Sequence, residues 1–242
     1  MDYGRILLKM SGESLKGSLQ SGISPAAVAH FATEIKSLVD AGIQVALVVG
    51  GGNIVRGTEL SGAGTERATA DYMGMLATVI NGLALQDALE QAGIYTRLQS
   101  AIHMEQVAEP YIRRRAVRHL EKGRVVIFSA GTGNPYFSTD TAAALRACEI
   151  NADAFVKGTR VDGVFTADPE KDASARRYLQ LTYQEAIEKN LHLLDGPAFV
   201  MCRDNSMPII ICDATKPGRL LEVLRGKGPH TIVKDFSASV LE

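Results

Sequence analysis

Short apolar runs alternate with helical segments along almost the whole chain, and this alternation limits the possible fold more than any other feature. The runs are nearly continuous, as in strands buried on both faces, and the segments between them carry one apolar face. Such alternation favours a mostly parallel sheet covered by helices on both faces. Strands are expected at 6–10, 43–49, 94–98, 125–129, 152–157, 208–212 and 231–234, with helices at 25–41, 68–92, 109–122 and 218–225 and from about 140, 182 and 195.

Capping signals support these helices. Ser24 and Pro25 are typical of an N-cap and first helical position, and Gly42 ends the apolar pattern. Thr182 with Glu185 three residues later predicts a capping box. We find no linker or internal repeat in the 242 residues, 46% of which are hydrophobic, so we predict a single domain over 1–242 with one large core.

Net charge, apolar run length and cysteine content argue against nucleic acid and membrane partners and indicate the compartment. The formal net charge of -1 provides no global field that would hold nucleic acid. No apolar run approaches the roughly 20 residues of a membrane span. Cys148, Cys202 and Cys212 are odd in number and far apart, which fits a reducing compartment. We therefore expect a soluble cytoplasmic protein without nucleic acid or membrane partners.

Ligands of open parallel sheets bind outside the carboxyl ends of the strands, so the loops that follow the predicted strands are the candidate sites. Lys9 ends the first strand beside Ser11 and Gly12, where its ammonium group could bridge phosphates of a donor. An ordinary exposed lysine is the alternative. Lys157 similarly ends a later strand, although the Asp-Gly and Asp-Pro pairs that follow it are common turn chemistry.

Two further loops carry phosphate-binding and nucleotide-binding features. Three glycines at 50–52 with Arg56 predict an anion site built from backbone N–H groups, although neither the Walker A nor the dinucleotide pattern is present. The loop 131–140 combines hydroxyl, amide and aromatic groups, which suits a nucleoside monophosphate. A plain flexible turn, and a structural turn capped by Thr139 or Asp140, are the respective alternatives.

Taken in order, five motifs closely resemble the bacterial uridylate kinases of the amino acid kinase superfamily, from about Arg5 to the last strand. They are K-M-S-G at 9–12, G-G-G-N-x-x-R at 50–56, D-Y-M-G-M-L-A-T at 71–78, S-A-G-T-G-N-P-Y-F-S-T-D at 129–140 and V-D-G-V-F-T-A-D-P at 161–169. The resemblance implies an α/β three-layer αβα sandwich with an eight-stranded, mostly parallel sheet. It also implies a homohexamer assembled as a trimer of dimers.

The implied activity is transfer of the γ-phosphoryl of ATP to UMP, giving UDP and ADP in pyrimidine nucleotide biosynthesis. Mg²⁺ accompanies ATP, with no metal ligands predicted from the protein itself; GTP is the implied activator and UTP the implied inhibitor. Lys9 and Asp140 match the phosphoryl-transfer centre. The implied ATP positions are Lys9, Met10, Ser11, Gly12, Gly52, Arg56, Thr159, Phe165 and Asp168. The implied UMP positions are Gly51, Asp71, Thr132, Gly133, Asn134, Pro135, Tyr136, Phe137, Ser138 and Thr139.

Two other functions remain open at this stage. An amino acid kinase acting on aspartate, glutamate or carbamate is disfavoured by Asp71 and the 132–139 loop. A nucleotide-binding storage protein without turnover is disfavoured by Lys9 and Asp140. One predicted helix carries a cluster of arginines. The cluster either binds an effector or forms an interface, or it is simply the solvated face of the helix. Its members are Arg113, Arg114, Arg115 and Arg118.

Overall fold

One ten-stranded sheet runs through the computed structural model, which describes residues 3–56, 60, 62, 64–169, 171–172, 174–191 and 193–242. Its strand order is β10-β7-β9-β8-β6-β1-β2-β5-β3-β4, and all neighbouring pairs are parallel except β8·β9 and β10·β7. The strands are β1 (Arg5–Met10), β2 (Gln44–Val49), β3 (Thr96–Ser100), β4 (Glu109–Pro110), β5 (Val125–Ser129), β6 (Ala154–Thr159), β7 (Tyr178–Thr182), β8 (Ile209–Asp213), β9 (Thr231–Lys234) and β10 (Val240–Leu241).

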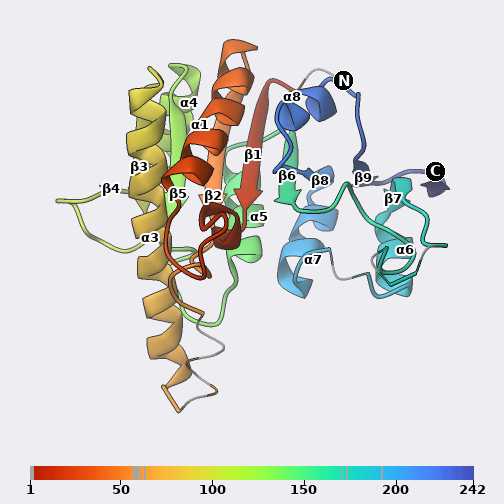
Figure 1. Cartoon of the computed structure of the whole chain (residues 1–242), viewed down its shortest axis with the longest axis horizontal. Helices are drawn as coiled ribbons and strands as arrows, with labels where there is room; N and C mark the ends of the chain where they lie inside the picture. Colours follow the sequence, from red (N-terminus) through yellow and green to blue (C-terminus); the bar gives the residue numbers. More distant parts are fainter. Residues whose placement is uncertain are drawn as a thin grey trace.

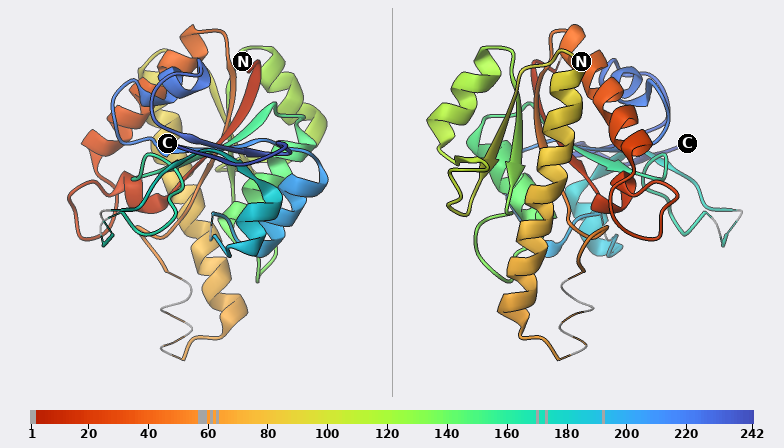
Figure 2. Two further views of the ribbon diagram at one scale, coloured as in Figure 1. Left: turned by 90° about the vertical axis from the view of Figure 1, so that its right-hand side faces the viewer. Right: turned by 60° about the vertical axis from the view of Figure 1, so that its left-hand side comes forward.

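Helices cover both faces of this sheet (Figures 1 and 2). One apolar cluster joins the sheet to α1, α3 and α8, and a second joins the opposite face to α4, α5, α6 and α7. The predicted three-layer α/β sandwich is confirmed. The helices are α1 (Pro25–Asp40), α3 (Arg67–Gln91), α4 (Arg113–Glu121), α5 (Thr139–Glu149), α6 (Tyr183–Glu188), α7 (Gly196–Asp204) and α8 (Arg219–Leu224), with a 3-10 helix η1 (Gly12–Leu15) after β1.

The central strand β1 shows why the sequence specifies this layering. Ile6 and Leu8 are fully buried in the α1/α3/α8 cluster, whereas Leu7 between them is fully buried in the opposite cluster. Side chains of a strand alternate between the two faces of its sheet. A strand that is covered on both sides therefore needs the continuous apolar run that the sequence carries.

Two expectations about elements are corrected. The sheet has ten described strands rather than eight, because the two-residue strands β4 and β10 extend its two edges. The predicted helix 109–122 begins only at Arg113, since Glu109 and Pro110 form β4. Proline lacks a backbone donor and pushes the residue before it towards extended geometry, which suits the last strand of an edge.

The capping box predicted at the start of α6 is only half formed. Thr182 Oγ1 accepts the Glu185 N–H at 3.0 Å, as expected of an N-cap. The Thr182 N–H instead donates to Ser239 Oγ at 3.0 Å, and the Glu185 carboxylate binds Lys189 and the Tyr178 hydroxyl. The preceding strand β7 is missing from the predicted strands. Two of its five residues are exposed, so the strand does not form a continuous apolar run.

None of the helices in the described part of the chain combines the length and the apolar character of a membrane span.

Strands β1 and β6 end at the lower edge of the sheet in Figure 1, where α3 extends beyond the strands. The loops after the parallel strands β1, β2, β5 and β6, which carry the candidate residues, begin at this edge.

Candidate functional site

Two lysines and one aspartate form a compact charged group at the carboxyl edge of the sheet. Lys9 Nζ lies 2.7 Å from Asp140 Oδ1, and Lys157 Nζ lies 2.8 Å from Asp140 Oδ2. The three side chains are only 11–19% exposed. Lys157 Nζ also donates to the Leu193 carbonyl at 2.6 Å. Lys9 and Asp140, which were predicted to belong together, are in direct contact.

The backbone explains this arrangement. Lys9 and Lys157 are direct partners in the parallel pairing of β1 with β6, so the sheet register places their side chains next to each other. Asp140 lies in the first turn of α5, whose N-cap is Ser138 rather than the expected Thr139 or Asp140; Ser138 Oγ accepts the Thr141 N–H at 3.0 Å. An acidic residue in a first turn is also favoured by the helix dipole.

The group carries a net positive charge that is held away from water. Burial raises the pKa of Asp140, but the charges of Lys9 and Lys157 outweigh that effect and bring its pKa below the usual value. Burial lowers the pKa of Lys157 more than its Asp140 contact raises it, and the nearby Lys9 charge lowers it further. With both lysines protonated, two cations and one carboxylate leave one positive charge in excess at this edge.

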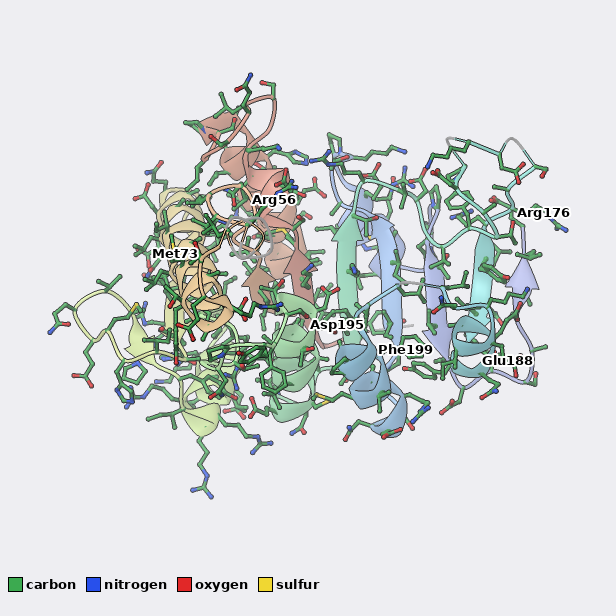
Figure 3. The ribbon with its side chains drawn as sticks, turned by 90° about the horizontal axis from the view of Figure 1, so that it is seen from below. Arg56, Met73, Arg176, Glu188, Asp195 and Phe199 are labelled. Atoms are coloured by element: carbon green, nitrogen blue, oxygen red, sulfur yellow. The ribbon has the colours of Figure 1, made fainter. Side chains whose placement is uncertain are left out.

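Two cavities meet at Arg56. The first cavity, of about 440 Å³, lies between the start of α3, the glycine loop and the 131–139 loop, and the second, of about 470 Å³, lies over the ends of β1 and β6. Arg56 lines both. Figure 3, which views the molecule from this edge, labels Arg56 and also Asp195, which is the N-cap of α7 and another lining residue of the first cavity.

Most predicted residues line one of these cavities. The predicted ATP positions in the wall of the second cavity are Lys9, Ser11, Arg56 and Thr159. The predicted UMP positions in the wall of the first cavity are Gly51, Asp71, Tyr136, Phe137, Ser138 and Thr139. Gly52, predicted for ATP, lines the first cavity instead. Nine predicted positions are absent from both walls: Met10, which is buried in β1, Gly12, Thr132, Gly133, Asn134, Pro135, Asp140, Phe165 and Asp168.

Close backbone packing explains the glycines of the first two loops. A side chain at Gly12 would lie 2.5 Å from the Gly50 carbonyl oxygen, and one at Gly51 would lie 2.7 Å from the Gly74 carbonyl oxygen of α3. The glycine loop is tied further by Asn53 and Asn81, whose buried side-chain amides exchange hydrogen bonds of 3.0 and 2.7 Å. Glycine is thus needed here so that η1, the loop and α3 can approach one another.

Glu13 holds the arginine at the junction of the cavities. Its carboxylate binds Arg56 Nη2 at 2.7 Å and Lys16 Nζ at 2.5 Å. Hydrogen bonds from Lys16 and then Arg56 lower the pKa of Glu13. The sequence carries no signal of this role for Glu13, because an acidic residue in the first turn of a helix is common.

The 131–139 loop adopts an unusual backbone. Ala130, Gly131, Gly133 and Tyr136 all have positive φ, with 72° at the bulky Tyr136. The Asn134 side chain folds onto its own loop and donates to the Thr132 carbonyl oxygen at 3.3 Å. Positive φ at residues other than glycine costs energy and is concentrated at functional sites.

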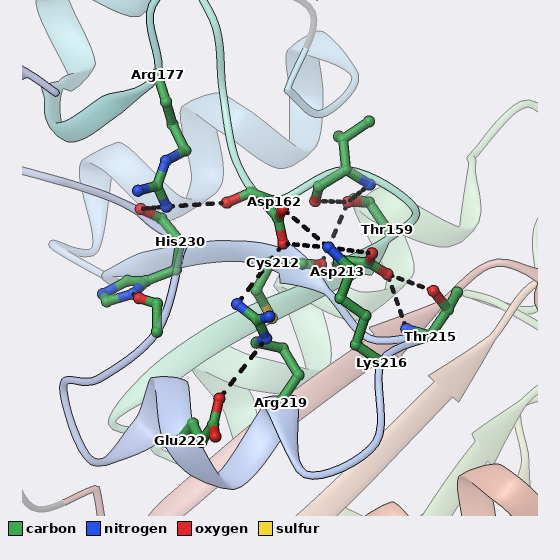
Figure 4. Close-up of polar contacts among 12 residues, drawn as sticks. Thr159, Asp162, Arg177, Cys212, Asp213, Thr215, Lys216, Arg219, Glu222 and His230 are labelled. Atoms are coloured by element: carbon green, nitrogen blue, oxygen red, sulfur yellow. Dashed lines mark hydrogen bonds and ion pairs between the residues drawn. The ribbon is translucent and has the colours of Figure 1, made fainter.

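The loop after β6 is anchored by Lys216 of the β8–α8 connection and by Arg219 at the start of α8 (Figure 4). Lys216 Nζ binds Asp162 Oδ2 at 3.0 Å, and Arg219 Nη1 lies 3.7 Å from Asp162 Oδ1. The backbone of Asp162 also accepts from buried Arg177 at 3.4 Å. Phe165 and Asp168, both predicted ATP positions, follow on this loop but do not line the second cavity.

Comparison with known proteins defines the class first. A sequence model described as "Amino acid kinase family" matches residues 4–213. The chain is 56% identical over 241 residues to the uridylate kinase of Salinibacter ruber, covering 99% of this chain and 93% of that protein. The UMP kinase structure from Bacillus anthracis superposes with a TM-score of 0.96 at 38% identity over 100% of both chains. That from Ureaplasma parvum superposes with a TM-score of 0.92 at 36% identity, covering 97% of this chain and 100% of the other.

The chain belongs to the amino acid kinase family, and within that family to the bacterial uridylate kinases. The resemblance inferred from the motifs is therefore confirmed.

Proposed function

We propose that this chain transfers the γ-phosphoryl group of ATP to UMP, giving UDP and ADP in pyrimidine nucleotide biosynthesis. The observation that carries the proposal is the Lys9, Asp140 and Lys157 group beside two cavities that share Arg56. A two-substrate transfer needs one pocket for each nucleotide, and positive charge where their phosphates meet.

The first cavity is proposed to hold UMP and the second to hold the phosphates of ATP. Asp71 would take the ribose of UMP, and the walls from Gly51 and Tyr136 to Thr139 would enclose the nucleotide. Lys9, Ser11 and Thr159 would face ATP, with Met10 and Gly12 shaping that loop. Arg56 would contact phosphates on both sides. The proposed nucleotide-binding set is completed by seven further residues: Gly52, Phe165, Asp168, Thr132, Gly133, Asn134 and Pro135.

Lys9 is proposed to neutralise the phosphoryl group as it moves, with Lys157 assisting and Asp140 holding both ammonium groups in place. No general base is needed, because a phosphate monoester with a second pKa of about 6 is already ionised at neutral pH. Catalysis then rests on position and charge, as is usual for phosphoryl transfer.

Mg²⁺ is proposed to arrive with ATP and to supply charge neutralisation at its phosphates. The ion prefers oxygen ligands and is commonly held by one or two carboxylates together with substrate phosphates. Asp140, the carboxylate of the charged group, already binds two ammonium groups at 2.7 and 2.8 Å. We therefore propose that ATP oxygens, rather than protein side chains, supply most of the ligands of Mg²⁺.

The proposed reaction is tested by measuring ADP release with Mg²⁺, ATP and each nucleoside monophosphate in turn, and with aspartate, glutamate and carbamate. UMP should be the preferred acceptor. ADP release with an amino acid or carbamate but not with UMP would contradict the proposal, as would nucleotide binding without any turnover.

A homohexamer is also proposed, and an exposed stripe on α3 supports contact between copies of the chain. Met73, Leu76, Ile80 and Leu83 are each 40–49% exposed and recur at steps of three and four residues. This is the spacing of a helix that packs lengthwise against another helix. Light scattering should give six times the chain mass of 26.0 kDa. A fully active monomer would contradict the proposal.

Regulation by GTP as an activator and by UTP as an inhibitor is proposed from family membership, together with a cytoplasmic location. UTP should compete with UMP, because both carry uridine and a 5′ phosphate that fit the same cavity. Rates measured at several UMP and UTP concentrations test this. Inhibition that excess UMP does not relieve would place UTP elsewhere.

A further inference from the structure

Arg67, in the first turn of α3, grips the carboxylate of Asp71 one helical turn later. Its Nε lies 3.0 Å from Oδ1 and 2.9 Å from Oδ2 of Asp71, so one donor is shared between both oxygens. Both residues line the first cavity. Arg67 belongs to none of the five motifs that carry the family resemblance.

The same carboxylate also holds the loop across the cavity. The Tyr136 N–H donates to Asp71 Oδ2 at 2.8 Å, although 65 residues separate them in the chain. This bond fixes a residue whose backbone is in the left-handed region, with φ of 72°. The Arg67 guanidinium lies 5.7 Å from the centre of the Tyr136 ring. We call Arg67, Asp71 and Tyr136 the acceptor clasp.

We infer that Arg67 is a positioning residue for the acceptor nucleotide, an inference that rests on the proposed binding of the UMP ribose by Asp71. A carboxylate offers about four lone-pair positions, and the contacts from Arg67 and Tyr136 occupy three of them. The remaining position lies on Oδ1. Arg67 thereby fixes the direction in which Asp71 can accept a ribose hydroxyl, and its guanidinium lies beside the ring of Tyr136.

A purely structural role for Arg67 predicts a different result. Arg67 is 47% exposed, and an exposed ion pair within one helix adds little to stability. If the pair did nothing more, its loss would leave the kinetics with every acceptor unchanged. The discriminating readout is therefore how strongly the enzyme prefers UMP to its 2′-deoxy analogue, dUMP.

The experiment measures kcat and KM for UMP and dUMP at saturating Mg-ATP in the full-length parent, R67A, R67K and K36A. The last is a matched control, because Lys36 and Asp40 form another exposed pair four residues apart on α1, away from both cavities. We expect R67A to raise KM for UMP about tenfold and to lower the UMP/dUMP ratio of kcat/KM about tenfold. The kcat value and the KM for ATP should change by less than about twofold.

R67K should lie between R67A and the parent, because a single ammonium group keeps the charge but lacks the planar guanidinium that stacks beside Tyr136. K36A should match the parent. A melting temperature of R67A close to that of K36A shows that the effect is not loss of fold, and R67K provides the same comparison if R67A fails to fold.

Outcomes separate the inference from the function on which it rests. A parent that phosphorylates UMP while R67A keeps the parental UMP/dUMP ratio overturns the inference alone. An equal loss of activity with both nucleotides also overturns it, because the ribose is then not what Arg67 positions. A parent that gives no ADP release with UMP overturns the proposed function, and the clasp with it.

Discussion

The charged group at the ends of β1 and β6 and the wall of the first cavity are built in opposite ways. Lys9 and Lys157 are register partners in the middle of a parallel sheet, so regular backbone hydrogen bonding fixes their separation. The acceptor wall instead depends on a loop with four residues at positive φ, tied to α3 by the Asp71 carboxylate. The rigid part carries charge that is useful for any phosphate. We expect the part that depends on side-chain contacts to select the acceptor.

This contrast predicts that damage to the charged group lowers the rate rather than the affinity. Lys9→Ala should reduce kcat by at least about 10³ while changing KM for UMP far less, because the lysine charge is most valuable as the phosphoryl moves. Steady-state kinetics at saturating Mg-ATP provides the measurement. Equal kcat in mutant and parent would remove Lys9 from the mechanism.

A matched control separates this effect from the general cost of removing a lysine. Lys189 is 52% exposed and pairs with Glu185 at the end of α6, and it lines neither cavity. Lys189→Ala should keep parental kcat and KM. A similar loss in both variants would indicate damage to the fold instead.

The acceptor wall should govern which base is accepted. Uracil presents an acceptor at O4 and a donor at N3, whereas cytosine presents the reverse pattern. Backbone groups of the 132–139 loop, of which residues 136–139 line the first cavity, can match only one of these patterns, and each mismatch costs about 1–3 kcal/mol. Two mismatches give a preference for UMP over CMP on the order of 10²–10⁴ in kcat/KM. Values within about threefold of each other would show that the wall does not read the base.

Asp71 tests the same wall from its helix side. Asp71→Ala removes the proposed ribose acceptor and the anchor of Tyr136 together, so KM for UMP should rise about 10- to 100-fold. KM for ATP should stay close to the parental value, because Asp71 does not line the second cavity. A defect confined to ATP would reverse the assignment of the two cavities.

The charged group at the ends of β1 and β6 could be predicted from the sequence better than the wall of the first cavity, for physical reasons. Apolar runs mark β1 and β6 and the strand-end lysines with them, so Lys9 and Lys157 could be placed at one edge before their register was known. Local signals could not reveal Arg67 or Glu13, whose importance comes from partners brought close by the fold. Asn134 looked suited to a ligand, yet its side chain bonds to its own loop, which spacing alone does not show.

The smallest expected effect concerns the pH dependence that Lys157 gives to the rigid part. Burial is the largest influence on the pKa of Lys157 and lowers it. The Asp140 charge raises this pKa, the Lys9 charge lowers it, and the Asp195 charge raises it by a smaller amount. Its ammonium group therefore loses a proton at a lower pH than the usual value of about 10.4. Because the neutral amine no longer balances phosphate charge, kcat/KM should fall as the pH rises through this pKa. That parameter reports groups of the free enzyme, to which the stated pKa direction applies.

Lys157→Arg tests this assignment, because a guanidinium keeps its charge throughout the accessible range. The variant should be less active than the parent near neutral pH, since the larger group does not reproduce the contact of 2.8 Å with Asp140. Its decline in the alkaline range below the usual lysine pKa of about 10.4, however, should be shallower than that of the parent by a few-fold. Ionisation of uracil affects both proteins equally and cancels in the ratio of the two profiles. Parallel profiles would show that Lys157 does not titrate in this range, and would leave the alkaline decline to other groups of the enzyme or the substrate.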